Sequence, residues 1–343
     1  MGKLMTKKKS HWLRHILGLL LTIICLGVIF KNVDLKGLKT ALAQFHWGYL
    51  IPAVLSLLVG YSFRVLRWAI MLQSAGSKIK VRTCVAPFFG SFALNNVLPL
   101  RLGDAMRAFI FPSAIGVDKI TATSSLLIER LIDLMTLLAC LLISLLIIKD
   151  IKLPSWLVHS IVSLVILGGT TFIFLLLFSA KIAKIIMQSV SKNSGKETLL
   201  RKLLALFAKL LQDITLMSKS SVLLTLFGLS LLAWFFESGL YLFILMGFDL
   251  SKGLSLAVLI MAMVTLSTLL PSSPGYIGPF HLAAFTALTM LGDSTEQAAS
   301  YAVLAHITLW LPITVIGGLV VLFTPELFRA VWRYSSKSNT GFN

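Results

Sequence analysis

Long runs of apolar residues constrain the fold of this chain more than any other feature. Runs of about 20 residues, the length that crosses a bilayer as a helix, recur at 14–30, 49–72, 122–148, 156–179, 221–246 and 297–323. The 343 residues are 57% hydrophobic and 13% charged, whereas soluble domains average about 25% charged residues. We therefore predict an all-α, polytopic integral membrane protein with about six full spans, folded as a single transmembrane domain over 1–343.

The basic residues indicate how the chain is oriented in its membrane. The net charge of +18 gathers at the edges of the apolar runs, which favours anionic lipid headgroups over nucleic acid as partners. Counting of basic residues places the N-terminus, the 73–82 loop, the 180–220 segment and the C-terminal tail in the cytoplasm. We predict a bacterial cytoplasmic (inner) membrane protein with both termini cytoplasmic. The 180–220 segment carries leucines at helical spacing, which fits an amphipathic helix on the cytoplasmic leaflet or a solvated topology signal.

Two further apolar regions, within 83–121 and 253–291, are interrupted by proline, glycine and charge. The loops at 31–48, 149–155 and 247–252 carry fewer basic residues and should face outward. The first broken region must then begin and end on the cytoplasmic side, and the second on the outer side. We predict that each is a re-entrant hairpin or a pair of thin spans, and that the two enter from opposite faces. Such opposed broken helices, with binding at the midplane, are typical of inverted-repeat transporters.

The first broken region places three charges and a proline inside a membrane-like stretch. It reads Asn-Asn-Val-Leu-Pro-Leu-Arg-Leu-Gly-Asp-Ala-Met-Arg over 95–107, and its proline interrupts the helix. Asp104 can pair with Arg101 or with Arg107 on the resumed helix, which leaves a net positive site that suits a phosphate. The alternative is an internal salt bridge that pins a hairpin. Asn95 either contributes to the site or satisfies the broken backbone.

A second polar cluster lies in the next apolar run. Glu129 and Asp133 share one face of a helix, with Arg130 about a quarter turn aside. Acids inside a spanning helix must pair or face water, and the arginines of the first broken region are their natural partners because the two helices are consecutive. That pairing would leave one arginine for an anionic ligand. Arg64 and Arg67, near the end of the second run, are expected to extend to lipid headgroups instead.

The second broken region contains the sequence Pro-Ser-Ser-Pro-Gly-Tyr-Ile-Gly-Pro-Phe-His, which no continuous helix accommodates. Exposed amides and the hydroxyl of Ser272 can bind a polar or anionic group from the side opposite to the first region. Gly275 and Gly278 would allow a hinge. His281 can protonate or donate a hydrogen bond, although a lone histidine is more often structural. Glu237 is a further intramembrane acid and a candidate partner of His281.

No motif of an enzyme active site is recognisable in the chain. It shows no nucleotide-binding loop, no cluster of histidines and acids at metal-ligand spacing, and no serine framed by a histidine and an aspartate. We therefore predict no enzyme activity, no metal and no cofactor. An intramembrane acyl or glycosyl transferase stays an alternative.

Three blocks of sequence resemble the flippase-like UPF0104 family, which includes the lysylphosphatidylglycerol synthase transmembrane region. They are the block over 95–107, Glu-Arg-Leu-Ile-Asp over 129–133, and Pro-Ser-Ser-Pro-Gly-Tyr-Ile-Gly over 271–278. The resemblance implies a lipid-handling membrane protein, since some members move aminoacylated phospholipids between leaflets. It also implies a polar core made of Arg101, Asp104, Arg107, Glu129, Arg130 and Asp133. The chain departs from many members, which carry Gly in place of Tyr276 and Glu in place of His281. It shows no soluble aminoacyl-transferase domain, so lysyl transfer is not implied.

These features lead to a hypothesis of function. We expect a membrane lipid transporter whose polar intramembrane cavity takes up an anionic phospholipid or a lipid-linked substrate (phospholipid, hopanoid-type lipid or polyprenyl-linked sugar). Arg101 or Arg107 would hold the phosphate, while Glu129 and Asp133 would tune that charge. The alternative is a non-transporting subunit that binds lipid or lipid-linked sugar for a partner glycosyl or acyl transferase. Membrane lipids are the expected partners, and self-association into a homo-oligomer is left open.

Overall fold

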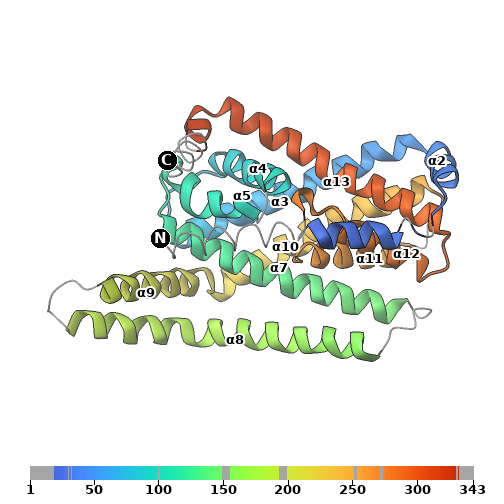
Figure 1. The fold of residues 1–343 in the computed structure, drawn as a ribbon. Coiled ribbons are helices and arrows are strands. Elements are labelled where there is room, and N and C mark those ends of the chain that lie inside the picture. The colour runs from blue at the N-terminus through green and yellow to red at the C-terminus, as the bar shows by residue number, and fades with distance from the viewer. Residues whose placement is uncertain are drawn as a thin grey trace, which may run out of the picture.

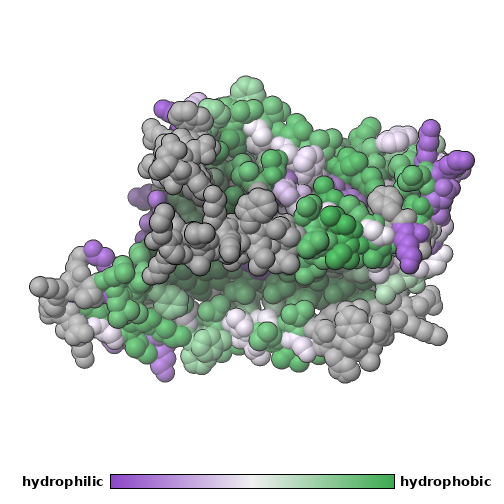
Figure 2. All heavy atoms as spheres, viewed as in Figure 1, coloured by the Kyte–Doolittle hydropathy of each residue, from purple (hydrophilic) through white to green (hydrophobic). Residues whose placement is uncertain are grey.

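The structure is a computed structural model that describes residues 19–29, 31, 33–98, 101–148, 155–192, 199–250, 253–270, 273–329 and 331. Within these ranges all the regular elements are helices, and they pack into a bundle (Figure 1). Hydrophobic side chains make up most of the coloured surface in Figure 2, and hydrophilic side chains gather toward its two ends. The predicted fold class, an all-α polytopic integral membrane protein, is confirmed.

Five of the described helices are long and apolar enough to cross a membrane. They are α3 (Leu50–Ser74) with the short η1 (Trp47–Tyr49) before it, α7 (Lys119–Ile147), α8 (Ser155–Lys192), α10 (Ser220–Gly247) and α13 (Thr295–Phe323). These helices match five of the predicted runs. Of the sixth run, 14–30, the structure describes a short apolar helix, Leu19–Ile29, and the residues before that helix lie outside the described part of the chain.

Three helices begin at a residue that the sequence marks as a helix cap. The carboxylate of Asp34 accepts hydrogen bonds from the first amides of α2 (Leu35–Ala43). Asp118 caps α7 and Ser294 caps α13 in the same way, each accepting from an amide three residues later. Such caps satisfy amides that the first helical turn leaves without partners.

Both broken regions form helical hairpins. The first runs inward as α4 (Val81–Val97) and returns as α5 (Leu102–Ala105), the π-helical η3 (Met106–Ile110) and α6 (Phe111–Ala114); the second consists of α11 (Leu254–Ser267), η4 (Pro274–Tyr276) and α12 (Pro279–Thr289). The arms of each hairpin pack on each other, and the two hairpins open toward opposite ends of the bundle (Figure 1). Every arm is shorter than about 20 residues, although α4, with 17, reaches the lower end of the range of lengths that span a bilayer. The choice between a re-entrant hairpin and a pair of thin spans therefore stays a prediction.

The tips of the two hairpins meet near the middle of α13. The indole Nε1 of Trp310 donates to the carbonyl of Asn96 on the first tip at 3.3 Å. The same nitrogen lies 3.1 Å from where a Cβ on Gly275 of the second tip would stand. Gly317 lets α4 approach α13 closely, because a Cβ there would collide with the carbonyl of Phe89. The core of the bundle therefore brings both broken segments to one place.

The basic 180–220 segment forms the end of α8 and the helix α9 (Leu199–Met217), which runs back along α8 (Figure 1). Leu211 and Ile214 are buried against α7 and α8, whereas Leu199 and Phe207 are exposed. The helix α9 is thus amphipathic, with part of its apolar face covered by neighbouring helices. The location of α9 on the cytoplasmic leaflet stays a prediction. Residues 193–198, between α8 and α9, lie outside the described ranges.

Candidate functional site

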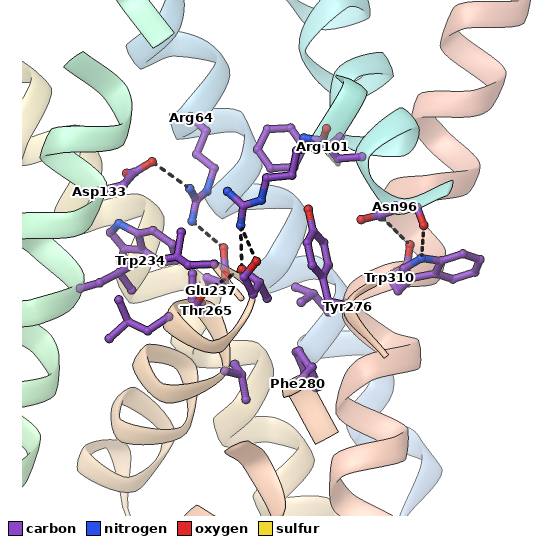
Figure 3. Close-up of a pocket in the computed structure, with 18 of the residues that line it drawn as sticks. Arg64, Asn96, Arg101, Asp133, Trp234, Glu237, Thr265, Tyr276, Phe280 and Trp310 are labelled. Atoms are coloured by element: carbon purple, nitrogen blue, oxygen red, sulfur yellow. Dashed lines mark hydrogen bonds and ion pairs between the residues drawn. The ribbon is translucent and has the colours of Figure 1, made fainter. Parts of the chain in front are cut away.

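A cavity of about 310 Å³ lies between the two hairpin tips, near the middle of the bundle (Figure 3). Helices α3, α7, α10 and α13 complete its wall. Its polar and aromatic lining includes Tyr61, Arg64, Asn95, Asn96, Arg101, Arg130, Asp133, Trp234, Glu237, Tyr241, Thr268, Tyr276, His306 and Trp310. Of the predicted site residues, the lining contains Asn95, Arg101, Arg130, Asp133, Glu237 and Gly275.

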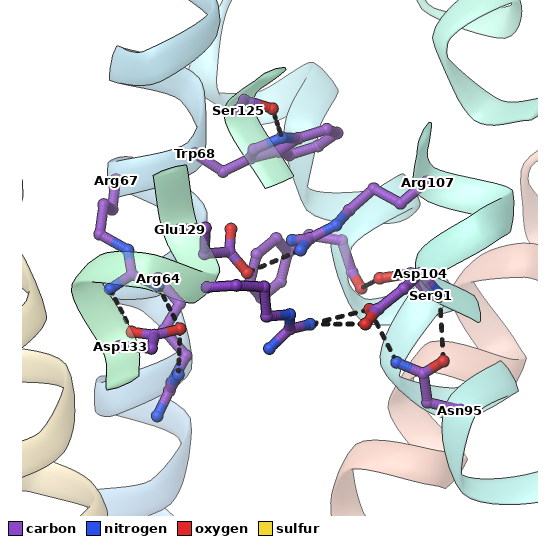
Figure 4. A network of polar contacts seen from close by, with 12 residues as sticks. Arg64, Arg67, Trp68, Ser91, Asn95, Asp104, Arg107, Ser125, Glu129 and Asp133 are labelled. Atoms are coloured by element: carbon purple, nitrogen blue, oxygen red, sulfur yellow. Dashed lines mark hydrogen bonds and ion pairs between the residues drawn. The ribbon is translucent and has the colours of Figure 1, made fainter. Parts of the chain in front are cut away.

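Two arginines of α3 bind the acids of α7 and α10 (Figure 4). Arg67 donates to both carboxylate oxygens of Asp133, at 2.6 and 3.0 Å, in a bidentate contact. Arg64 donates to Glu237 at 2.7 Å and lies 3.9 Å from Asp133. The expectation that Arg64 and Arg67 extend to lipid headgroups is wrong, because their side chains are only 5% and 0% exposed. The Asp133 carboxylate accepts hydrogen bonds from both terminal nitrogens of Arg67. It thereby satisfies a guanidinium that is buried in the bundle and has no contact with bulk water.

Arg107 pairs with Glu129, as the sequence predicted. The distance from Arg107 Nη2 to Glu129 Oε1 is 2.6 Å, and both side chains are 1% exposed. The Arg107 guanidinium also lies over the ring of Phe88 at 4.8 Å and over that of Trp68 at 5.3 Å. Neither Arg107 nor Glu129 lines the cavity. This pair therefore fixes the return arm of the first hairpin against α7.

Asp104 pairs with Arg130, and not with Arg101 or Arg107 as predicted. Arg130 Nη2 lies 2.8 and 2.9 Å from the two oxygens of Asp104. Asp104 does not pair with Arg101 because Arg101 precedes the resumed helix and is not at helical spacing from Asp104. It does not pair with Arg107 because that side chain is bound to Glu129 of α7. Asn95 donates to Asp104 at 2.9 Å and accepts from its backbone amide at 3.0 Å, so Asn95 does satisfy the broken backbone.

Arg101 is the arginine left over. Its Nη2 donates to the carbonyl and hydroxyl oxygens of Thr268 on the second hairpin, at 3.1 and 2.9 Å, and among the described residues it has no carboxylate at ion-pair distance. The site holds one more arginine than carboxylate, since Arg64, Arg67, Arg101, Arg107 and Arg130 stand against Asp104, Glu129, Asp133 and Glu237. The surplus positive charge therefore lies at the meeting point of the two tips.

Backbone strain marks the same point. Arg101 has φ of +52° on the first tip and Tyr276 has φ of +59° on the second, in the left-handed region that costs a residue with a side chain about 1–2 kcal/mol. The guanidinium of Arg101 lies 5.5 Å from the centre of the Tyr276 ring. Two strained residues that touch across two hairpins point to a functional constraint on both.

The second tip is held by the first described helix and by α13. Thr22 donates to the carbonyl of Ile277 at 2.9 Å, and Thr22 backbone stands so close to Gly278 that a Cβ would meet it at 2.8 Å. His306 Nε2 is hydrogen-bonded to the carbonyl of Gly275 at 2.7 Å. Both glycines have positive φ, +75° and +101°, as a sharp tip requires. Ser272 lies outside the described residues.

His281 does not contact Glu237, so that predicted pairing is wrong. Glu237 is bound by Arg64, while the His281 ring contacts the His306 ring in a tilted arrangement, with ring centroids 4.6 Å apart. His281 and Gly278 do not line the cavity. The histidine lies behind the second tip and supports it.

Several lining residues were missed by the sequence analysis. Acids inside a spanning helix were expected to pair or to face water, and the same rule applies to arginine. It would have identified Arg64, which lies ten residues before the end of α3 at Ser74, about 15 Å inside the helix. Trp234 and Tyr241 read as ordinary membrane-helix aromatics. Nothing in the local sequence marks Thr268 as a partner of Arg101.

Comparison with known proteins agrees with the family resemblance. Over 246 residues, 72% of this chain and 95% of the relative, the chain is 24% identical to the UPF0104 membrane protein MJ1078 of Methanocaldococcus jannaschii. Over 120 residues, 35% of this chain, it is 28% identical to the protein named Glycosyltransferase AglD of Haloferax volcanii, and this match spans 19% of that protein's length. Residues 15–317 match the family model described as the lysylphosphatidylglycerol synthase TM region. The chain, an integral membrane protein, therefore belongs to the family of the lysylphosphatidylglycerol synthase TM region.

Proposed function

We propose that this protein binds an anionic phospholipid, or another lipid-linked phosphate, in the cavity between the hairpin tips and moves its headgroup between leaflets. The observation that carries the proposal is the position of Arg101. It is the surplus cation of the site, it lines the cavity, and it lies where hairpins from opposite ends of the bundle meet. Transporters with inverted broken helices bind their substrates at such midplane points.

The geometry suits a phosphate at Arg101. A guanidinium presents paired N–H donors that match phosphate oxygens. The Thr268 hydroxyl accepts from Arg101 at 2.9 Å and donates to the Thr265 carbonyl at 2.7 Å, so it holds this guanidinium at the cavity wall. The other four arginines of this network are bound to carboxylates, so among the described residues of the site only Arg101 offers an uncompensated charge. Acyl chains would stay in the bilayer, along the apolar outer surface of the helices.

The contacts between the tips suggest how binding and movement are coupled. Arg101 now holds the second hairpin through Thr268 and the ring of Tyr276. A phosphate that takes up the Arg101 donors competes with these contacts and loosens the tips from each other. Gly275 and Gly278 allow the second tip to swing, because glycine adopts these backbone angles without steric cost. Opening toward alternate sides would then expose the headgroup to each leaflet in turn.

We further propose a bacterial cytoplasmic membrane location with both termini cytoplasmic. The basic residues of the α8–α9 hairpin support it: Lys181, Lys184, Arg201, Lys202 and Lys209. This hairpin projects at the end of the bundle where α7 starts and α13 finishes (Figure 1). Basic residues at one end of a bundle favour the cytoplasmic side.

A translocation assay tests the proposal. The full chain is purified and reconstituted into liposomes that contain fluorescent phosphatidylglycerol, and the label in the outer leaflet is bleached by dithionite. We expect the wild-type protein to make inner-leaflet label accessible, and Arg101→Glu to return accessibility to the level of protein-free liposomes. Arg82→Glu, an exposed charge reversal at the start of the same hairpin, is the matched control and should behave as wild type. Undiminished translocation by Arg101→Glu would refute the proposed role.

The second candidate function is a non-transporting subunit that presents lipid-linked sugar to a glycosyl transferase. The partial match to a protein named as a glycosyltransferase favours it. The two functions differ in the same assay, because a subunit would bind lipid through Arg101 without moving it in partner-free liposomes. A purified protein that yields a new glycolipid from a sugar donor, detected by mass spectrometry, would instead indicate a transferase.

A further inference from the structure

His306 of α13 lines the cavity and supports the second tip at the same time. Its Nε2 lies 2.7 Å from the carbonyl oxygen of Gly275, and a carbonyl oxygen only accepts hydrogen bonds. The Nε2 therefore carries a proton, which in the neutral ring leaves the lone pair on Nδ1. Within the described part of the chain this Nδ1 has no hydrogen-bond partner, and it is not among the unpartnered polar atoms that the fold closes off. A basic nitrogen therefore opens to the cavity.

The neighbouring histidine does not offer the same site. His281 of α12 contacts the His306 ring, with ring centroids 4.6 Å apart, but it does not line the cavity. Its Nδ1 is buried without a described partner, so a proton placed there would have no acceptor. Two charged rings at this distance oppose each other, so the pair holds at most one added proton. Since only His306 reaches the cavity, a proton taken from there belongs on His306 Nδ1.

The charges near His306 decide when its ring takes up a proton. Titratable and charged groups stand on the elements around it: Tyr61, Arg64, Arg101, Arg130, Asp133, Glu237, Tyr241 and Tyr276 in the cavity wall, His281 on α12, Cys25 behind the second tip, and Glu296 with the exposed Lys36 and Lys39 at the start of α13. Tyrosine and cysteine are ordinarily neutral near pH 7, and Glu296 lies ten residues, about 15 Å, before His306.

Arg101 is the cavity charge that opposes a second cation. Asp133 and Glu237 are bound by arginines of α3, and Arg130 is bound by Asp104. The positive charge of Arg101 has no such counter-charge among the described residues, so it disfavours a charged imidazole in the same cavity. A phosphate bound to Arg101 cancels that charge. Protonation of His306 therefore becomes easier when the anion is present.

We infer that the cavity takes up one proton, at His306 Nδ1, together with a phosphodiester anion; this rests on the proposed phosphate site at Arg101. The proton comes from water, forms its N–H bond with the Nδ1 lone pair, and returns to water when the anion leaves, so no bond of the lipid breaks. The anion and the proton stabilise each other, because the new N–H presents a charged donor to the cavity. Translocation would then move protons with the lipid and draw on a proton gradient.

Isothermal titration calorimetry of the full chain in non-ionic detergent measures this proton. Short-chain phosphatidylglycerol is the probe, because its phosphodiester lacks the second ionisation that a phosphate monoester shows near about pH 6. Titrations in buffers of different ionisation enthalpy give the number of protons taken up per lipid bound. We expect net uptake, up to about one proton, within about pH 5–8, where histidine titrates. The affinity should fall by up to about tenfold per pH unit as the pH rises through that range.

Two variants locate the proton. His306→Gln should bind phosphatidylglycerol without proton uptake and with an affinity independent of pH, while its amide N–H keeps a donor for the Gly275 carbonyl. His281→Phe is the matched control, since an aromatic ring preserves the contacts with Phe280 and His306, and it should take up protons as the wild type does. Proton uptake that persists in His306→Gln, or that is lost only in His281→Phe, would overturn the assignment.

The outcomes distinguish this inference from the proposed function. Wild-type protein that binds phosphatidylglycerol without proton uptake anywhere between about pH 5 and 8 would overturn the inference, whether or not the variants fold. If Arg101→Gln loses the lipid in that case, the phosphate site stands and only the proton site is wrong. If Arg101→Gln binds phosphatidylglycerol as tightly as the wild type, the phosphate site itself is wrong.

Discussion

Removing one partner of the Arg107–Glu129 ion pair should destabilise the protein far more than removing both. The two side chains are 1% exposed and their charged atoms lie 2.6 Å apart. In each single variant, Arg107→Met or Glu129→Leu, the remaining charge is buried without its counter-charge. Truncation of one partner in a buried pair typically costs about 3–5 kcal/mol.

The double variant should recover much of that loss. Arg107 Nε and Nη1 and Glu129 Oε2 have no hydrogen-bond partner among the described residues, so the native pair already carries desolvated polar atoms. Arg107 is surrounded by the rings of Phe88 and Trp68, which a methionine side chain can contact in its place. Replacement of both partners by apolar side chains is often close to neutral. The double variant should therefore lose less stability than either single variant, so the interaction energy of the cycle should be at least as large as one single loss, about 3–5 kcal/mol.

The cycle is measured by unfolding the four proteins in mixed detergent micelles. The free energy of unfolding is followed by tryptophan fluorescence, and the wild type is the reference for both single variants and the double variant. Single variants that lose less than about 1 kcal/mol, or losses that add up in the double variant, would refute the argument that this pair is a buried structural contact.

Three further predictions concern packing, pH and charge. Gly317→Ala should destabilise the protein by about 1–3 kcal/mol, because its Cβ would collide with the carbonyl of Phe89. The control Gly318→Ala should not, because the space around its Cβ is open. Equal melting temperatures of the two variants would contradict the close contact at Gly317. Burial raises the pKa of Asp213 above its ordinary value, so the folded state holds this proton more tightly and stability falls as the pH rises above about 3.9. Asp213→Asn should therefore raise the melting temperature at pH 7 but not at a pH near or below about 3.9. A gain in melting temperature that does not depend on pH would contradict this prediction. Arg101→Gln should lower the melting temperature only modestly, because it loses the contacts to Thr268 and Tyr276 but no described ion pair; aggregation of this variant would count against the assignment of Arg101 to the ligand.

The architecture could be predicted because it follows from local composition. Apolar runs of bilayer length predict spans, and the distribution of basic residues fixes the side on which each broken region starts. The structure confirms both hairpins and their opposed directions. The pair Arg107–Glu129 was also predicted correctly, since consecutive helices bring those two residues together.

The rest of the network depends on contacts that no local pattern contains. Glu237 meets Arg64 across 173 positions of the chain, and that pairing follows from the packing of α3 on α10. The pairing of Asp104 was mispredicted because helical spacing was applied to Arg101, whose backbone is left-handed. A tip that must turn sharply and keep its arginine in the cavity overrides the local preference of that residue.

The central claim is that Arg101 holds the phosphate of a membrane lipid, and the lipid that accompanies the purified protein tests it most directly. Wild type and Arg101→Gln are extracted in the same mild detergent, and their bound lipids are identified and quantified by mass spectrometry. The account predicts that a phosphate-bearing lipid accompanies the wild-type protein and is lost from Arg101→Gln, which stays folded. Retention of the same amount of this lipid by folded Arg101→Gln would contradict it.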